Sequence, residues 1–312
     1  MKLIDLHCDT IDKLMLNVEE YNLRSNEFSV DIDRLKKADS LAQTFALFVD
    51  TSAVKNPYDY CMSMANKFFE EIKKNEDVIS LATNYKEIME NQEKGKMSAL
   101  LAIEEGAVLE GKMENLNKFY DLGVRMMTLT WNHPNEIGYP HNVGVSKEKG
   151  LTKFGKEVVE NMNELGMLVD VSHLSDAGFY DVASISKKPF IATHSNAREV
   201  MGHSRNLTDD MIKVLANNGG VTGLNFFHSF LSEDSLTKTE YIVNHMKHII
   251  NVGGIDVLSI GTDFDGIDSI VEIKDISEMD KLVIALEKSG FTHDQIENIY
   301  YKNALRVIKD VL

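Results

Sequence analysis

Short apolar segments alternate with helical patterns along this whole chain, and that alternation limits the fold more than any other feature. Each apolar segment has the length of one β-strand, and the stretch after it carries apolar residues at helical spacing. The eight segments that we expect to be strands are residues 2–6, 43–49, 98–103, 125–130, 167–171, 190–193, 221–226 and 256–261. Strands that alternate with helices form a parallel sheet covered by helices.

Eight strand–helix units predict a (β/α)8 barrel of the TIM type, which we expect to be a single domain spanning residues 1–312. No composition break or proline-rich linker divides the chain. An open doubly wound sheet is the alternative, but no Gly-x-Gly-x-x-Gly follows the first expected strand. Two long stretches follow strands, residues 50–97 and 131–150, and such stretches are where barrels carry their substrate-binding residues.

Residues typical of helix ends support the helical assignments. Gly166 follows an apolar stripe and is expected to end that helix in the left-handed conformation. Ser175 and Thr208 each precede a helical pattern and are expected to cap it. Thr292 and Gln295 have the spacing of a capping box. The histidines in or beside the later helical patterns are expected at the surface: His245, His248 and His293.

Charge and cysteine content exclude several classes of function. The chain has 33 Lys and Arg against 49 Asp and Glu, a net charge of −16, so its surface repels phosphate backbones and nucleic acid is not an expected partner. Its two cysteines form no disulfide framework, which fits a reducing compartment. The first strand follows Met1 and Lys2 without a signal-peptide pattern, and no apolar run is long enough to span a bilayer. We therefore expect a cytoplasmic protein with no membrane partner.

Metal-type side chains follow five of the expected strands. In a parallel barrel the carboxyl ends of all strands share one rim, so these side chains should face one another. Each has an ordinary explanation of its own, such as a hydrogen-bonded histidine or a solvated loop carboxylate, but those explanations do not predict a gathering at one end. Imidazole and carboxylate groups are ligands that zinc accepts. The candidate metal-ligand set is His7, Asp9, Glu104, His173, His194 and Asp263.

Six ligands exceed the three protein ligands usual for one catalytic zinc, so we expect two zinc ions per chain. The two oxygens of Glu104 would let it bridge ions about 3.5–4 Å apart. A water between such ions loses its proton near neutral pH, and the expected reaction class is therefore hydrolysis. The ligand types set a preference for zinc and leave other divalent metals, manganese or cobalt, open.

The residues around these positions resemble the membrane dipeptidase (renal dipeptidase) family of zinc peptidases, in a bacterial, unanchored form. Each matching stretch is unspecific alone, but together they run in family order across nearly the whole chain. The stretches are Asp5-Leu6-His7-Cys8-Asp9, Ile103-Glu104-Glu105-Gly106, Leu151-Thr152-Lys153-Phe154-Gly155, Asp170-Val171-Ser172-His173, Thr193-His194-Ser195, Ser204-Arg205-Asn206-Leu207 and Gly261-Thr262-Asp263-Phe264-Asp265-Gly266.

The resemblance implies a two-zinc barrel enzyme that cleaves dipeptides, and some family members tolerate a D-residue at the second position. A metal-bridging hydroxide would attack the peptide carbonyl, with Glu104 as the metal bridge and Asp263 passing the proton to the leaving amine. Arg205 matches the arginine that receives the substrate's C-terminal carboxylate, a task that suits a guanidinium fork. By position, one zinc would be held by His7, Asp9 and Asp263, and the other by His173 and His194.

The sequence departs from the animal members of the family at two substrate contacts. Those members carry a histidine directly after the Leu-Thr of the fourth strand, where this chain has Trp131, followed by Asn132 and His133. Either His133 or Asn132 takes over the contact with the substrate, or neither does. Phe227 stands where animal members have a tyrosine, which removes that hydroxyl.

Two other functions fit parts of this pattern. An amidohydrolase-like metal hydrolase would use similar ligands on N-acyl amino acids or other small amides, because Arg205 favours a substrate carboxylate without demanding a dipeptide. A barrel that only binds small peptides would not need the complete ligand set. We therefore predict a zinc-dependent dipeptidase acting on small dipeptides, L,D-dipeptides included. The sequence leaves a homodimer open and does not give the side chains of the substrate.

Overall fold

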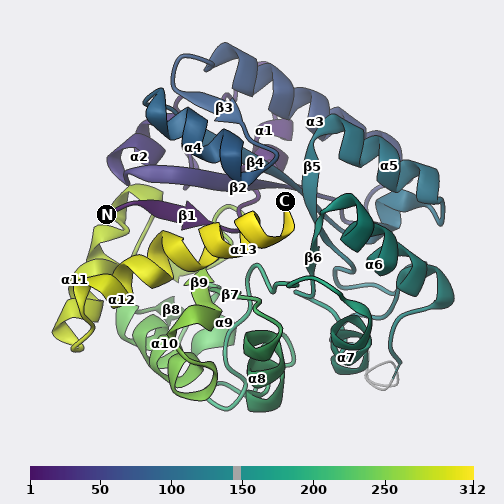
Figure 1. Ribbon diagram of the computed structural model, residues 1–312. Helices are drawn as coiled ribbons and strands as arrows, with labels where there is room; N and C mark the ends of the chain where they lie inside the picture. Colours follow the sequence, from purple (N-terminus) through teal and green to yellow (C-terminus); the bar gives the residue numbers. More distant parts are fainter. Residues whose placement is uncertain (143–148) are drawn as a thin grey trace.

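A parallel sheet forms the centre of the protein, and helices surround it (Figure 1). The computed structural model describes residues 1–142 and 149–312. Seven of the eight segments expected as strands form this sheet in the order β6-β5-β4-β2-β1-β9-β7, and the additional strand β3 pairs with β4. The strands are β1 (Leu3–Asp5), β2 (Ser40–Phe48), β3 (Ile79–Leu81), β4 (Met97–Glu104), β5 (Val124–Thr128), β6 (Leu168–Asp170), β7 (Thr222–Leu224) and β9 (Leu258–Ile260). All of these pairs are parallel, as the alternation of strands and helices predicted.

The segment expected as a strand at residues 190–193 forms only isolated bridges. Ile191 bridges to Asp170 at the end of β6, and Ala192 bridges to Thr222 of β7. Regular strand pairing is interrupted after Ala192 because side chains accept the next two backbone donors, although Ser195 N again donates to the carbonyl of Gly223 at 2.8 Å. The N–H of Thr193 donates to Asp170 Oδ1 at 2.9 Å, and that of His194 donates to Ser172 Oγ at 3.2 Å. The prediction of a full strand was therefore wrong, but the segment does link the two ends of the sheet.

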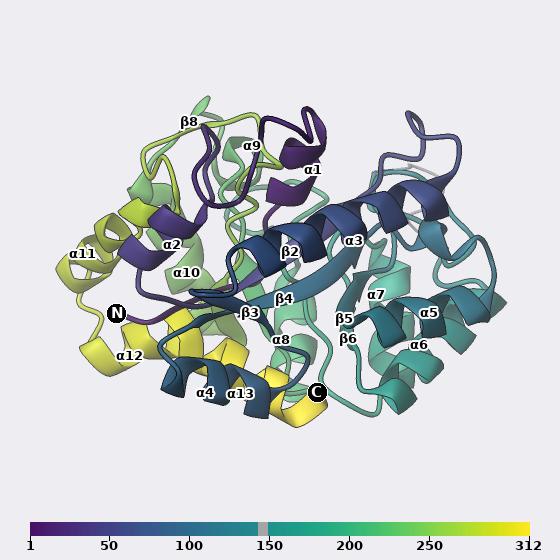
Figure 2. The same ribbon diagram turned by 90° about the horizontal axis from the view of Figure 1, so that it is seen from above.

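Helices pack around the sheet and across one of its ends. Residues of α13 that face the sheet, Val307 and Ile308, share a core with Ile4, Leu100 and Met126 of the strands. Figure 2 shows α13 at the opposite end of the sheet from α1 and α9. The helices are α1 (Thr10–Met15), α2 (Ile32–Lys37), α3 (Pro57–Lys74), α4 (Tyr85–Glu93), α5 (Met113–Leu122), α6 (Lys153–Leu165), α7 (Asp176–Ile185), α8 (Asp209–Asn217), α9 (His228–Leu231), α10 (Thr239–Gly253), α11 (Asp280–Lys288), α12 (His293–Glu297) and α13 (Asn303–Val311).

The predicted helix ends are confirmed. Gly166 ends α6 with φ 75°, in the left-handed region that glycine adopts without strain. Ser175 and Thr208 cap α7 and α8 by accepting hydrogen bonds from Gly178 N and Met211 N. Thr292 and Gln295 form the full capping box of α12. Capping residues in the sequence were therefore enough to predict where these helices begin or end.

Several features of the fold were not predicted, among them β3 of the main sheet. A second, two-stranded parallel sheet joins β8 (Leu236–Thr237) to β10 (Ile270–Val271), and strands this short carry no periodicity. His245, expected at the surface, is fully buried in α10, where its Nδ1 accepts from Ala197 N at 3.1 Å and its Nε2 lies 3.1 Å from the carbonyl of Leu231. A histidine that satisfies both ring nitrogens in this way can be buried at little cost.

Within the described residues, no helix combines the length and apolar character that crossing a bilayer requires.

Candidate metal centre

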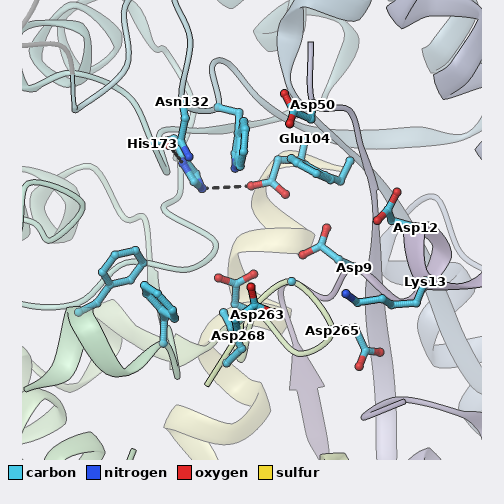
Figure 3. Close-up of a pocket in the computed structure, with 16 residues that line it drawn as sticks. Asp9, Asp12, Lys13, Asp50, Glu104, Asn132, His173, Asp263, Asp265 and Asp268 are labelled. Carbon is cyan, nitrogen blue, oxygen red and sulfur yellow. Dashed lines mark hydrogen bonds and ion pairs between the residues drawn. The ribbon is translucent and has the colours of Figure 1, made fainter. Parts of the chain in front are cut away.

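The six predicted ligands converge at one end of the sheet. Four of them, Asp9, Glu104, His173 and Asp263, are labelled in Figure 3. His7 and Asp9 follow β1, Glu104 is the last residue of β4, and Asp263 follows β9. His173 lies three residues beyond β6, and His194 follows the bridging residue Ala192 by two positions. Ligand atoms within 4.8 Å of one another form three overlapping groups: His7, Asp9 and Glu104; His7, His194 and Asp263; and Glu104, His173 and His194.

Glu104 lies between the other ligands, and its two oxygens face different partners. Its Oε2 is 3.1 Å from His7 Nε2. Its Oε1 is 3.1 Å from His173 Nε2 and 3.4 Å from His194 Nε2. This is the placement that a carboxylate bridging two cations requires, because each oxygen can serve one ion.

We call His7, Asp9 and Asp263 the acid half of the site. His7 Nε2 lies 3.4 Å from Asp9 Oδ2 and 3.9 Å from Asp263 Oδ1. The second oxygen of Asp9 is buried without a hydrogen-bond partner, so the half has an unused acceptor. Gly266 lies against both carboxylates, and a Cβ there would be 2.1 Å from Asp9 Oδ2 and 2.7 Å from Asp263 Oδ1. Only glycine allows the chain to pass this close.

We call His173 and His194 the histidine half. Their Nε2 atoms are 3.0 Å apart, close enough for one cation to contact both. Each ring is held through its other nitrogen: His173 Nδ1 is 3.1 Å from Asn132 Oδ1, and His194 Nδ1 is 2.7 Å from Thr193 Oγ1. Partners of this kind fix the orientation of metal-binding histidines.

The protonation tendencies fit a site built for cations. Burial raises the pKa of Asp9 well above its usual value, and the negative charge of Glu104 adds to the effect. Burial likewise raises the pKa of Asp263 to about 6. Burial lowers the pKa of His173 to about 4, which keeps its ring neutral. Burial works against the charged form of Glu104 too, but His7 and the hydrogen bonds from the other histidines outweigh it and hold the pKa of Glu104 well below its usual value.

The protonation states of these side chains bear on whether the residues suit a metal ion. Three carboxylates crowd around each other in a buried place, where like charges are costly unless a cation compensates them. Neutral imidazoles with free Nε2 lone pairs are the form in which histidine binds a metal. The crowding, the neutral rings of His173 and His194 and the oxygen of Asp9 that finds no partner among the described residues suit divalent cations. His7 differs: burial works against its charged form, but Glu104 and Asp9 outweigh burial and raise the pKa of His7 well above its usual value.

A cavity of about 300 Å³ opens onto this centre. Asp9, Glu104, His173 and Asp263 line its floor, and Figure 3 shows Asp12, Lys13, Asp50 and Asp268 around them. Its apolar wall comes from Phe48, Trp131, Phe227 and Phe230. The volume is at the lower end of small-ligand pockets, which favours a small substrate.

The three residues predicted to contact the substrate lie at different positions relative to the cavity. Asn132 lines the cavity, with its oxygen directed at His173. Arg205 is 4% exposed and, like His133, does not line the cavity: its Nη1 donates to Ser195 Oγ at 3.0 Å and its Nη2 to the carbonyl of His194 at 3.1 Å, while Nε finds no partner among the described residues. The side chain of His133 is 47% exposed and does not line the cavity, and its Nε2 is 4.0 Å from Asp50 Oδ1.

Sequence reasoning missed several residues that support the ligands. Asn225 follows β7 and donates from Nδ2 to Asp263 Oδ2 at 2.7 Å. Its position after a strand was the signal that could have found it. His141, in the long loop after β5, is 7% exposed and lies 3.3 Å through Nε2 from Asn132 Oδ1, a contact that no spacing indicates.

Comparison with known proteins agrees with this geometry. The pattern of the membrane dipeptidase family (Peptidase family M19) matches residues 1–312. A protein from the pqqA 5′ region of Klebsiella pneumoniae is 36% identical over 225 residues, 69% of this chain and 83% of that protein. An uncharacterized dipeptidase of Schizosaccharomyces pombe is 34% identical over 221 residues, 69% of this chain but only 53% of the yeast protein.

A solved structure gives the same fold. The metallopeptidase of Rhodobacter sphaeroides, liganded with a phosphinate mimic of the dipeptide L-Ala-D-Ala, superposes with a TM-score of 0.93 at 23% identity, covering 100% of this chain and 99% of that one. The strand-end carboxylates and histidines, the cavity above them and the match along the full sequence lead to one assignment: the chain belongs to the membrane dipeptidase family of metallopeptidases.

Proposed function

We propose that this chain is a zinc-dependent dipeptidase with a two-ion centre held by the six predicted ligands. The observation that carries the proposal is the placement of Glu104, whose two oxygens face different groups of ligands. Membership of the metallopeptidase family supports metal-dependent cleavage of dipeptides. The proposal goes beyond family membership in three respects: the number of ions, the choice of zinc and the role of each residue.

In this proposal the acid half holds one ion, the histidine half holds the other, and Glu104 bridges them. The mixture of imidazole and carboxylate ligands favours zinc, with manganese and cobalt as the competing metals. When bound, the ions would polarise the substrate carbonyl and lower the pKa of a water molecule near it.

The residues of the chain itself supply positioning and proton transfer. Asp263 lines the cavity beside Glu104, and we assign it the proton passing from the attacking water to the leaving amine. The buried guanidinium of Arg205, whose Nε has no hydrogen-bond partner, is assigned the C-terminal carboxylate of the substrate. The apolar wall around Trp131 and Phe227 would exclude water from the reacting amide.

We also infer that the sheet closes into a (β/α)8 barrel that forms one domain. The bridges of Ile191 to Asp170 and of Ala192 to Thr222 support this, because they join β6 to β7 across the remaining gap. Closure would bring all six ligands onto one rim, as catalytic residues of such barrels are arranged.

A substrate panel tests the proposed function. Zinc-reconstituted protein should cleave both L,L- and L,D-dipeptides, and a chelator should abolish the activity until zinc is restored. The L,D-dipeptides are included because the Rhodobacter relative was solved with an L-Ala-D-Ala mimic. Faster turnover of N-acyl amino acids than of dipeptides would favour the amidohydrolase alternative instead. Protein that takes up no metal and cleaves neither class would refute both.

A further inference from the structure

A chain of buried hydrogen bonds leads from the end of β6 to His194. Asp170, the last residue of β6, is 1% exposed and accepts four hydrogen bonds. Its Oδ1 accepts from the N–H groups of Ser172 and Thr193, both at 2.9 Å. Its Oδ2 accepts from the hydroxyls of Thr128 and Thr193, both at 2.6 Å. The carboxylate is therefore saturated by protein donors and has no free oxygen for a metal.

Counting hydrogens along this chain determines which nitrogen of His194 carries its proton. The hydroxyl of Thr193 has one hydrogen, and that hydrogen is donated to Asp170. The same oxygen lies 2.7 Å from His194 Nδ1, so it can only accept there. The hydrogen in that second contact must come from Nδ1. The Nε2 atom of His194 is then left with its lone pair, directed toward Glu104 and His173.

We propose that Asp170 and Thr193 are a positioning pair, which holds His194 in the tautomer and orientation that a divalent cation needs. The inference rests on the proposed function, since it assigns His194 to a metal. Asp170 itself touches neither the cavity nor the imidazole and acts through the Thr193 hydroxyl. Outer partners of metal-binding histidines are worth about 10–100-fold in metal affinity or activity.

The chain contains a matched control for this pair. Thr128, the last residue of β5, donates to the same oxygen of Asp170 at the same distance and is 2% exposed, against 1% for Thr193. Only Thr193 contacts the imidazole. Thr128→Val and Thr193→Val therefore each remove one hydroxyl donor from the same carboxylate oxygen. They differ in the link to the His194 ring and in a longer contact, 3.4 Å, between Thr193 Oγ1 and Ser172 Oγ.

The experiment compares Thr193→Val, Thr193→Ser and Thr128→Val with the unmodified protein. Zinc affinity is measured by competition with a chromophoric chelator, and folding by thermal unfolding. We expect Thr193→Val to weaken zinc binding about 10–100-fold. Thr193→Ser keeps the hydroxyl and should stay close to the unmodified protein, as should Thr128→Val. Equal weakening by Thr193→Val and Thr128→Val would overturn the proposal, because the loss would then come from Asp170 and not from the ring.

Nitrogen NMR of the histidine rings in the metal-free protein separates this inference from the proposed function. We expect Nδ1 of His194 to carry a proton in the unmodified protein and in Thr128→Val, and the Nε2–H tautomer to appear in Thr193→Val. An unprotonated Nδ1 in the unmodified protein would refute the positioning role even if the protein cleaves dipeptides. Conversely, a protein that showed the expected tautomer and yet bound no zinc would contradict the proposed function alone.

Discussion

The acid half and the histidine half of the centre are built in different ways. In the acid half, His7 and Asp9 come from one strand end, and Asp263 is brought against them by a chain that passes so closely that only Gly266 fits. In the histidine half, His173 follows β6 and His194 follows the bridging residue Ala192, and each ring is held through Nδ1 by a neutral side chain. Close backbone approach shapes the acid half, in addition to the hydrogen bond that Asn225 donates to Asp263, whereas outer hydrogen bonds hold both rings of the histidine half.

The two halves also differ in how burial shifts the pKa values of their side chains. Burial raises the pKa values of Asp9 and Asp263, so the acid half resists carrying its full negative charge until a cation compensates it. Burial lowers the pKa values of His173 and His194, so the histidine half already has the neutral form that binds a metal. The acid half thus contributes charge to metal binding, and the histidine half contributes a prepared geometry.

The largest expected effect comes from removing the group that joins the halves. Glu104→Gln keeps the shape but replaces one carboxylate oxygen by an amide nitrogen, which cannot bind a cation. We expect dipeptide cleavage to fall by more than about 100-fold, since even outer partners of metal ligands are worth about 10–100-fold. Steady-state kinetics with zinc-reconstituted protein measures the loss, and metal analysis should show fewer than two ions per chain.

A surface change on a nearby segment controls for this variant. Glu110 is 37% exposed and, within residues 1–142 and 149–312, its ion pair is with Lys112, so Glu110→Gln should leave cleavage unchanged. Unimpaired cleavage by folded Glu104→Gln would show that the two halves do not share a ligand.

Gly266→Ala should damage the acid half selectively. The added Cβ would meet Asp9 Oδ2 at 2.1 Å and must displace it, and displacement of a reacting group by about 1 Å can cost about 100-fold in rate. We expect one ion to be lost and the ion of the histidine half to be retained in a chelator titration. At Gly202 a Cβ would meet nothing within 4 Å, so Gly202→Ala is the matched control. Loss of both ions from Gly266→Ala would mean that the halves do not bind independently.

The sequence predicted which side chains converge better than it predicted their surroundings, for a physical reason. His7, Asp9, Glu104 and Asp263 stand at or just after strand ends, and the pattern of apolar strands locates those ends. The gathering of ligands at one end of the sheet follows from parallel strands alone. What supports the ligands depends on contacts between distant segments, such as Asn225 with Asp263, and these leave no periodic trace.

Backbone conformation was the other part that could not be predicted. His173 has φ 66° and Asp263 has φ 62°, in the left-handed region that residues other than glycine seldom adopt. Both are candidate ligands, and such conformations gather at functional sites where the rest of the fold holds them. A sequence pattern gives no sign of them because neither position carries a glycine. The segment at Ile191 could not be predicted for a similar reason. Side-chain oxygens accept from backbone N–H groups that would donate to a neighbouring strand in a regular sheet.

Asn132→Ala should weaken the histidine half without touching the acid half. The variant removes the oxygen that lies 3.1 Å from His173 Nδ1 and 3.3 Å from His141 Nε2. We expect cleavage to fall about 10-fold, the lower end of the range for outer partners of metal ligands. Chelator titration should show a weakened ion in the histidine half and an unchanged one in the acid half. A rise in KM with normal metal binding would instead assign Asn132 to the substrate.

His133→Ala should have the smallest effect, and it decides between the two residues that the sequence offered for the lost histidine contact. The side chain of His133 is about half exposed, does not line the cavity and lies 4.0 Å from Asp50, whereas Asn132 lines the cavity and contacts a candidate ligand. Surface substitutions usually change free energies by no more than about 0.5 kcal/mol, so both kcat and KM should stay within about twofold. A fall as large as that of Asn132→Ala would require the loop after β5 to turn His133 into the cavity when substrate binds. A residue that belongs to neither half would then contact the substrate.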